Sequence, residues 1–152
     1  MERLNSYVGM ADNDYAYAKC GIEVGDRLGN YNGTASIAAQ AAEKYLKAVI
    51  EMCFTDDADA MDLLHSHNLR SLYNKIILKF ELHVSSKDCK WLGDFYFDAR
   101  YPGDNFVTVN KEDAEECLRL LDILSNDVHR ILEDEEVQRE KQRQILGKLK
   151  AF

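Results

Sequence analysis

The stretch "IAAQAAEKYLKAVIE", residues 37–51, contains the clearest helical pattern in the chain. Its apolar side chains recur at three- and four-residue steps, the spacing that places them on one face of an α-helix. We expect a helix from Tyr31 or Thr34 to Phe54, with alanines that let a neighbouring helix approach closely. The apolar face comprises Ile37, Ala38, Ala41, Ala42, Tyr45, Ala48, Val49, Met52 and Cys53. The opposite, polar face comprises Gln40, Glu43, Lys44, Lys47 and Glu51.

The same periodicity extends over most of the chain and predicts an all-α fold. The other predicted helices run from about Asp12 to Leu28, from Leu69 to Leu82, from Ser86 to Arg100, and from the capping pattern at Asn110–Asp113 through Leu132. The acidic segment "TDDADAMD", residues 55–62, is expected to connect two of them. Gly21 and Gly25, one turn apart in the first helix, are expected to permit close contact with a neighbouring helix, at a cost of about 1 kcal/mol each in helix propensity.

The length and charge of the chain limit the number of domains it can form and the ligands it is expected to bind. With 152 residues it fits one domain, and we expect a core over residues 12–132 followed by a charged extension over residues 133–152. A net charge of −8 repels phosphate groups, which argues against unspecific binding of nucleic acid. No apolar run resembles a signal peptide or a membrane span, so we expect a cytoplasmic protein.

The extension changes the sign of its charge along its length. Residues 133–136 are all acidic, whereas residues 139–150 contain five basic residues and one acidic residue. We expect a helical, partly frayed segment that serves as a solvated face or a dimer contact rather than as a nucleic-acid arm.

The only proline, Pro102, breaks the helical pattern in "FDARYPGDNF", residues 97–106. It cannot continue a helix, and it pushes Tyr101 towards an extended backbone. Proline followed by Gly103 suits a type II turn. Arg100 is then held at a helix C-terminus, where its charge complements the exposed carbonyl groups. Two interpretations remain open: this structural role alone, or a guanidinium beside an aromatic ring that binds phosphate and stacks on a base.

Neither the cysteines nor the histidines predict a metal site. The four cysteines, Cys20, Cys53, Cys89 and Cys117, contain no C-x-x-C spacing, so we expect reduced and mostly buried thiols. His65 and His67 form H-x-H, but no nearby residue supplies the third or fourth ligand that a metal requires. We therefore expect no metal and no cofactor, apart from ATP or GTP as a bound ligand.

Three segments stand out together and in this order: "AAQAAEKYLKAVIE" (residues 38–51), "HSHNLRSL" (65–72) and "DARYPGD" (98–104). They resemble the HEPN family of helical nucleotide-binding proteins. The resemblance covers about Asp12 to Leu132 and implies an up-and-down antiparallel bundle of four main helices, often a homodimer. Related proteins work beside a minimal nucleotidyltransferase, in some cases as a toxin–antitoxin pair. Others bind nucleotides, and a large subset are metal-independent ribonucleases.

The chain departs from the ribonuclease subset of that family. Those enzymes carry an arginine followed after four to six residues by a histidine, usually in the last helix. Here the last predicted helix contains His129, but the nearest preceding arginine is Arg119, with nine residues between them. Arg130 stands on the wrong side of the histidine. No catalytic residue is therefore predicted.

The resemblance and the charges together predict a nucleotide-binding groove between helices. Its candidate residues are Lys44, Lys47, His67, Arg100 and Tyr101. The favoured hypothesis is a non-catalytic, dimeric module that binds a nucleotide or a nucleotidyltransferase-like partner. The alternatives are a divergent ribonuclease and a dimeric adaptor without a ligand.

Overall fold

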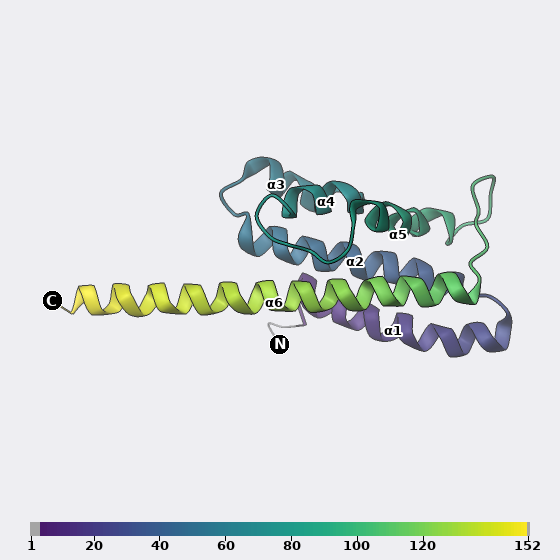
Figure 1. Cartoon of the computed structure of the whole chain (residues 1–152), viewed down its shortest axis with the longest axis horizontal. Helices are drawn as coiled ribbons and strands as arrows, with labels where there is room; N and C mark the ends of the chain where they lie inside the picture. Colours follow the sequence, from purple (N-terminus) through teal and green to yellow (C-terminus); the bar gives the residue numbers. More distant parts are fainter. Residues whose placement is uncertain (1–3, 152) are drawn as a thin grey trace.

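The computed structural model describes residues 4–151, and within that range it contains helices, turns and loops but no strand (Figure 1). The elements are α1 (Tyr7–Leu28), α2 (Asn32–Cys53), α3 (Ala58–Asp62), the 3₁₀ helix η1 (Leu63–His65), α4 (Leu69–Ile76), α5 (Ser86–Asp98) and α6 (Lys111–Lys150). The predicted all-α fold is confirmed.

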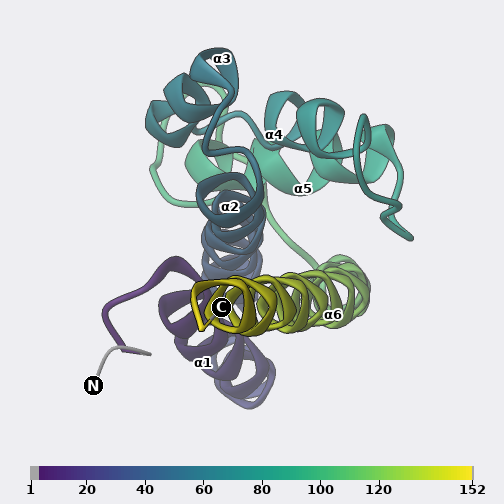
Figure 2. The same ribbon diagram turned by 90° about the vertical axis from the view of Figure 1, so that its left-hand side faces the viewer.

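Four long helices, α1, α2, α5 and α6, run alternately up and down along the long axis of the molecule (Figure 1). α2 lies at the centre, with α1 and α6 on one side and α4 and α5 on the other (Figure 2). The turn between α1 and α2 and the loop between α5 and α6 consequently lie at the same end of the bundle. That end contains the largest hollow described below.

The central helix α2 is buried on nearly all sides because it contacts α1, α4, α5 and α6. The prediction that Glu43 and Lys47 lie on a polar, solvent-facing side of this helix is therefore wrong, because their exposed fractions are only 8% and 5%. The buried charges are paired, with Lys47 Nζ lying 3.3 Å from Glu43 Oε2. Such pairing is the usual condition under which a folded protein tolerates buried charge.

The close contact between α1 and α2 depends on the two glycines of α1. A Cβ atom on Gly21 would lie 2.0 Å from Thr34 Oγ1, and one on Gly25 would lie 2.2 Å from the ring of Tyr31. Both distances are well below van der Waals contact, so the prediction that these glycines permit close helix contact is confirmed. Their absence of a side chain lets the start of α2 lie directly against α1.

Two boundaries differ from the predictions because of local capping. α1 begins at Tyr7 rather than near Asp12, since Ser6 Oγ accepts a hydrogen bond from the Gly9 amide at 3.0 Å. The segment predicted only as a connection contains the short helix α3, which Asp57 caps by accepting from the Ala60 amide at 3.0 Å.

α4 ends at Ile76, six residues before the predicted boundary at Leu82. Lys79 leaves the helix and its Nζ donates to the Cys53 carbonyl at the C-terminus of α2, at 2.7 Å. Arg139 of α6 donates to the neighbouring Met52 carbonyl at 2.5 Å. Cations at these exposed carbonyls complement the helix dipole and stabilise the end of α2.

α6 continues as one helix from Lys111 to Lys150, so the charged extension is helical, as predicted. No helix within residues 4–151 combines the length and the apolar character that a membrane crossing requires.

Candidate functional site

The loop between α5 and α6 carries Arg100 and is closed at its base. The Val107 amide donates to the Asp98 carbonyl at 2.8 Å, which brings the two ends of the loop together. The side chain of Asn32, which is buried in the first turn of α2, forms hydrogen bonds with backbone groups at both ends of this loop. Its Nδ2 donates to the carbonyls of Ala99 (3.1 Å) and Val107 (2.7 Å), and its Oδ1 accepts from the Val109 amide at 2.9 Å.

Sequence reasoning missed Asn32, because "NYNG" indicates only a turn between two helices. Nothing in a single sequence shows that an asparagine at a helix start reaches a loop more than sixty residues away. The amide is nevertheless the group that fixes the loop on α2, since it satisfies three backbone groups at once.

The turn itself differs from the type II turn predicted for residues 101–104. The hydrogen bond that closes it joins the Phe106 amide to the Gly103 carbonyl at 3.1 Å, so the turn is centred two residues later. Gly103 has φ of +151°, outside the range near +80° that a type II turn requires. Pro102 still ends the helical pattern. At Gly103 the backbone has a positive φ, a conformation that favours glycine.

Arg100 lies just beyond α5, with its guanidinium beside two aromatic rings. The guanidinium carbon is 5.4 Å from the ring centroid of Tyr96 and 5.3 Å from that of Tyr101. No salt bridge to Arg100 is found within residues 4–151. The contacts found for this cation are therefore aromatic, of the kind in which a guanidinium lies beside a ring.

A groove of about 750 Å³ opens beside Arg100 at this end of the bundle. Its walls come from α1, from the first turns of α2 and from the loop after α5. The residues that line it include Tyr17, Cys20 and Leu28 of α1, and Arg100, Tyr101 and Phe106 of the loop. The volume lies in the range of small-molecule sites, and the lining combines aromatic surface with a few polar groups.

The N-terminus of α2 also lines the groove, through Asn32, Gly33 and Thr34. The first turn of a helix leaves backbone amides without intrahelical acceptors. The Asn32 amide donates to Asn30 Oδ1 at 2.9 Å, and the Tyr31 side chain provides no capping hydrogen bond. The partial positive charge of this helix end adds to that of Arg100 and favours an anion between them.

Two of the other candidate residues are connected to Arg100 through contacts. His67 Nδ1 lies 2.8 Å from Glu43 Oε1, and Glu43 is the partner of buried Lys47. The His67 ring stacks on Tyr96 with centroids 5.1 Å apart, and Arg100 contacts the same tyrosine. His67 thus contacts the aromatic ring beside Arg100, whereas Lys47 is linked to that ring only through Glu43 and His67, and neither lines the groove.

Lys44 belongs to a different part of the molecule. Its Nζ pairs with Asp14 on α1. The next residue of α2, Tyr45, belongs to a separate polar group, in which Asp12 Oδ1 accepts from the Tyr45 hydroxyl at 2.6 Å and lies 2.7 Å from His129 Nε2 of α6. Burial, followed by the hydrogen bond to Asp12, raises the pKa of Tyr45 above its usual value. The structure therefore does not bring Lys44 together with Arg100.

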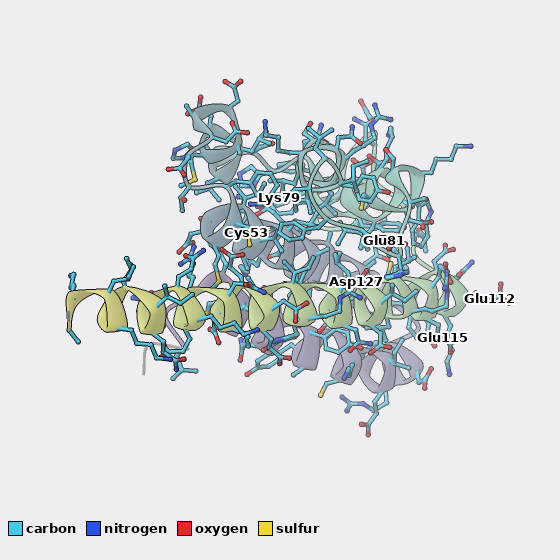
Figure 3. All side chains as sticks on the ribbon, turned by 60° about the vertical axis from the view of Figure 1, so that its left-hand side comes forward. Cys53, Lys79, Glu81, Glu112, Glu115 and Asp127 are labelled. Atoms are coloured by element: carbon cyan, nitrogen blue, oxygen red, sulfur yellow. The ribbon has the colours of Figure 1, made fainter. Side chains whose placement is uncertain are left out.

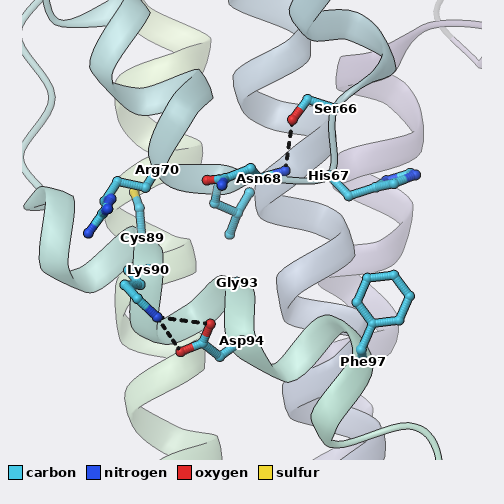
Figure 4. A pocket seen from close by; sticks show the side chains of 10 residues that line it. Ser66, His67, Asn68, Arg70, Cys89, Lys90, Gly93, Asp94 and Phe97 are labelled. Carbon is cyan, nitrogen blue, oxygen red and sulfur yellow. Dashed lines mark hydrogen bonds and ion pairs between the residues drawn. The ribbon is translucent and has the colours of Figure 1, made fainter.

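A second hollow, of about 410 Å³, lies between the start of α4 and α5 (Figure 4). His67 and Phe97 line it, together with the exposed cations Arg70 and Lys90. Lys90 is paired with Asp94 at 3.1 Å. Figure 4 shows the His67 ring pointing away from Arg70 and Lys90, so these groups do not converge on one point.

The cysteines and histidines form no metal site within residues 4–151, where no group of three or more His, Cys, Asp and Glu residues suits a metal ion. Burial raises the pKa of the Cys89 and Cys117 thiols to about 12 and that of Cys53 to about 11. These three buried thiols are protonated at neutral pH, whereas Cys20 is exposed in the groove.

Comparison with known proteins assigns the family. Neither the curated proteins nor the solved structures compared with this chain gave a match. The model of the HEPN domain matches residues 5–135, which is most of the chain and includes every helix except the distal part of α6. By this match, and in agreement with its all-helical up-and-down bundle, the chain belongs to the HEPN domain family.

Proposed function

We propose that this chain is a non-catalytic nucleotide-binding module whose ligand occupies the groove beside Arg100. The observation that carries the proposal is the position of Arg100 at the rim of a groove of about 750 Å³, where it lies against Tyr96 and Tyr101 and has no carboxylate partner among residues 4–151. The guanidinium and the first turn of α2 would bind the phosphates. The exposed rings of Tyr101 and Phe106 would stack on the base.

The geometry of α6 favours this role over a ribonuclease. Arg119 is bound by Glu116 through two hydrogen bonds of 2.8 and 2.6 Å. It lies ten residues before His129 on one helix, a separation of about 15 Å along the axis. His129 itself is 2.7 Å from Asp12. Within one chain the two groups therefore cannot act on the same phosphate.

Thermal unfolding in the presence of ATP or GTP tests the proposal. A ligand that binds only the folded state raises the melting temperature, and millimolar concentrations suffice for a weak site. We expect an increase for the wild-type chain and a smaller one for Arg100→Ala. Incubation with single-stranded RNA, with His129→Ala as control, tests the ribonuclease. Metal-independent cleavage that requires His129 would contradict a non-catalytic module.

Partner binding is the second candidate, favoured by the apolar surface of α1 beside the groove. Tyr17 and Leu28 are 64% and 72% exposed, more than a large apolar side chain usually is. A nucleotidyltransferase-like protein, as in the toxin–antitoxin-like pairs of the family, would cover this surface. The test is co-purification with such a protein, with Tyr17→Glu and Leu28→Glu expected to weaken the complex.

A further inference from the structure

The distal part of α6 extends beyond the body of the bundle. Figure 1 and Figure 3 both show this end of the helix separated from the other elements. Within residues 4–151, the hydrogen bond from Arg139 to the Met52 carbonyl is the last one found between α6 and another element. The following residues, 140–150, continue for about 16 Å along the helix axis. Every residue from 136 to 150 is exposed.

A stripe of side chains along this projecting segment continues the buried face of α6. The stripe is polar at Glu135, Gln138 and Gln142 and becomes apolar again at the tip, at Ile145 and Leu149, with Leu146 beside them. Ile131 is buried against the bundle, whereas Ile145, Leu146 and Leu149 are 58%, 56% and 66% exposed. A short helical segment without tertiary packing is marginal in water, so this face favours a partner.

A hollow of about 240 Å³ adjoins the same stripe at the point where α6 leaves the bundle. Its apolar surface comes from Phe80 and Ile131. Glu81, Asp134 and Glu135 place three carboxylates at its rim, against one cation, Arg130, which lies 3.4 Å from Asp127. An apolar side chain flanked by lysines, such as Leu149 between Lys148 and Lys150, has the size and charge that this hollow accepts.

The charge pattern of α6 indicates which molecule supplies that side chain. Residues 133–136 are acidic, and residues 139–150 have a net charge of +4, from five basic residues and one acidic residue. Two such helices in antiparallel orientation place the acidic block of each beside the basic tip of the other. A twofold axis at Gln142 sets Lys148 opposite Glu136 and Lys150 opposite Asp134 of the second copy, which brings Leu146 and Leu149 to its hollow.

We infer that the projecting end of α6 binds a second copy of this chain in an antiparallel, twofold arrangement. Each tip fills the partner's hollow with Leu146 and Leu149, and the lysines of each tip pair with the acidic block of the other. Because the same residues act on both sides, the interface closes as a dimer and does not extend into a filament.

Sedimentation equilibrium of the full chain over a range of concentrations tests the inference. The wild-type chain is expected to dimerise. Leu146→Glu combined with Leu149→Glu should raise the dissociation constant at least about tenfold, because it removes apolar contacts and adds charge beside acidic residues. The matched control is Phe97→Glu, an exposed apolar residue at the end of α5 that lines neither the groove beside Arg100 nor the hollow at Ile131, and it should leave dimerisation unchanged. A monomeric wild type, or a dimer that survives the α6 substitutions, would overturn the inference.

A charge exchange tests the antiparallel register separately. One variant carries Lys148→Glu and Lys150→Glu, and the other carries Asp134→Lys and Glu136→Lys. Alone, each variant sets like charges opposite one another and should be monomeric, with unchanged helix content by circular dichroism. A mixture restores opposite charges at both contacts, so heterodimers should form. Two monomeric variants that remain monomeric when mixed would contradict the arrangement.

Discussion

Asn32 Nδ2 donates a 2.7 Å hydrogen bond to the carbonyl of Val107, which joins the first turn of α2 to the loop that carries Arg100. The same side chain also bonds Ala99 and Val109. Since Asn32 is only 7% exposed, water does not readily replace these bonds. The position of Arg100 therefore depends on a buried amide on another helix, as well as on the proline turn.

Replacing Asn32 by leucine should destabilise the fold and weaken nucleotide binding. Two carbonyls and one amide lose their partner, and unsatisfied buried groups cost about 1–3 kcal/mol. Urea denaturation measures the loss. Asn32→Asp is the matched control, because a carboxylate still accepts from the Val109 amide but cannot donate to the carbonyls. Unchanged stability in both variants would contradict the role assigned to this side chain.

The buried pair of Lys47 and Glu43 makes a second stability prediction. Lys47→Met removes the cation from Glu43 Oε2 and leaves the carboxylate with His67 at its other oxygen. Breaking a buried pair from one side costs about 3–5 kcal/mol. Adding Glu43→Gln removes the remaining charge and should recover part of that loss. Denaturation midpoints of the single and double variants provide the comparison. A double variant less stable than Lys47→Met would show that the charge is not the cause.

Cys20 reports directly on the groove, because its thiol is exposed there while the other three cysteines are buried. At neutral pH we expect one thiol per chain to react rapidly with Ellman's reagent, and the rest only after unfolding. Bound nucleotide should slow the reaction of Cys20, and Arg100→Ala should abolish this protection. If ATP or GTP stabilises the chain but does not protect Cys20, the nucleotide binds elsewhere.

Stability should fall at alkaline pH. Burial raises the pKa of Cys89 and Cys117 to about 12, whereas a thiol in the unfolded chain loses its proton near pH 8.5. Above that pH the unfolded state binds fewer protons than the folded state, so the free energy of unfolding decreases as pH rises. Each thiol contributes at most about 1.4 kcal/mol per pH unit.

Urea denaturation between about pH 8 and pH 10 checks this decrease. Cys89→Ala and Cys117→Ala should each reduce the slope, whereas Cys20→Ala, which changes an exposed thiol, should leave it unchanged. Equal slopes in all variants would exclude the buried thiols as the cause.

Helix periodicity predicted the fold well, because each long helix must bury an apolar face. Periodicity failed where the burial of a side chain or the end of a helix depends on contacts between residues that are far apart in the sequence. Lys47 resembles a solvent-facing lysine until α2 is enclosed by its neighbours. α4 ends before Lys79, whose side chain bonds the last turn of another helix, and Asn32 bonds a loop distant in sequence. Of the candidate site residues, only Arg100 and Tyr101 lie at the groove, since local sequence identifies the turn but not its surroundings.

Calorimetric titration with ATP and GTP tests the central claim most directly, using the wild-type chain, Arg100→Ala and Arg70→Ala. Arg70 is the matched control, an exposed arginine in the hollow between α4 and α5. We predict saturable binding that Arg100→Ala weakens at least about tenfold, as expected for a charge-assisted contact, and that Arg70→Ala leaves unchanged. No binding of either nucleotide, or binding that depends on Arg70 and not on Arg100, would contradict the proposed groove.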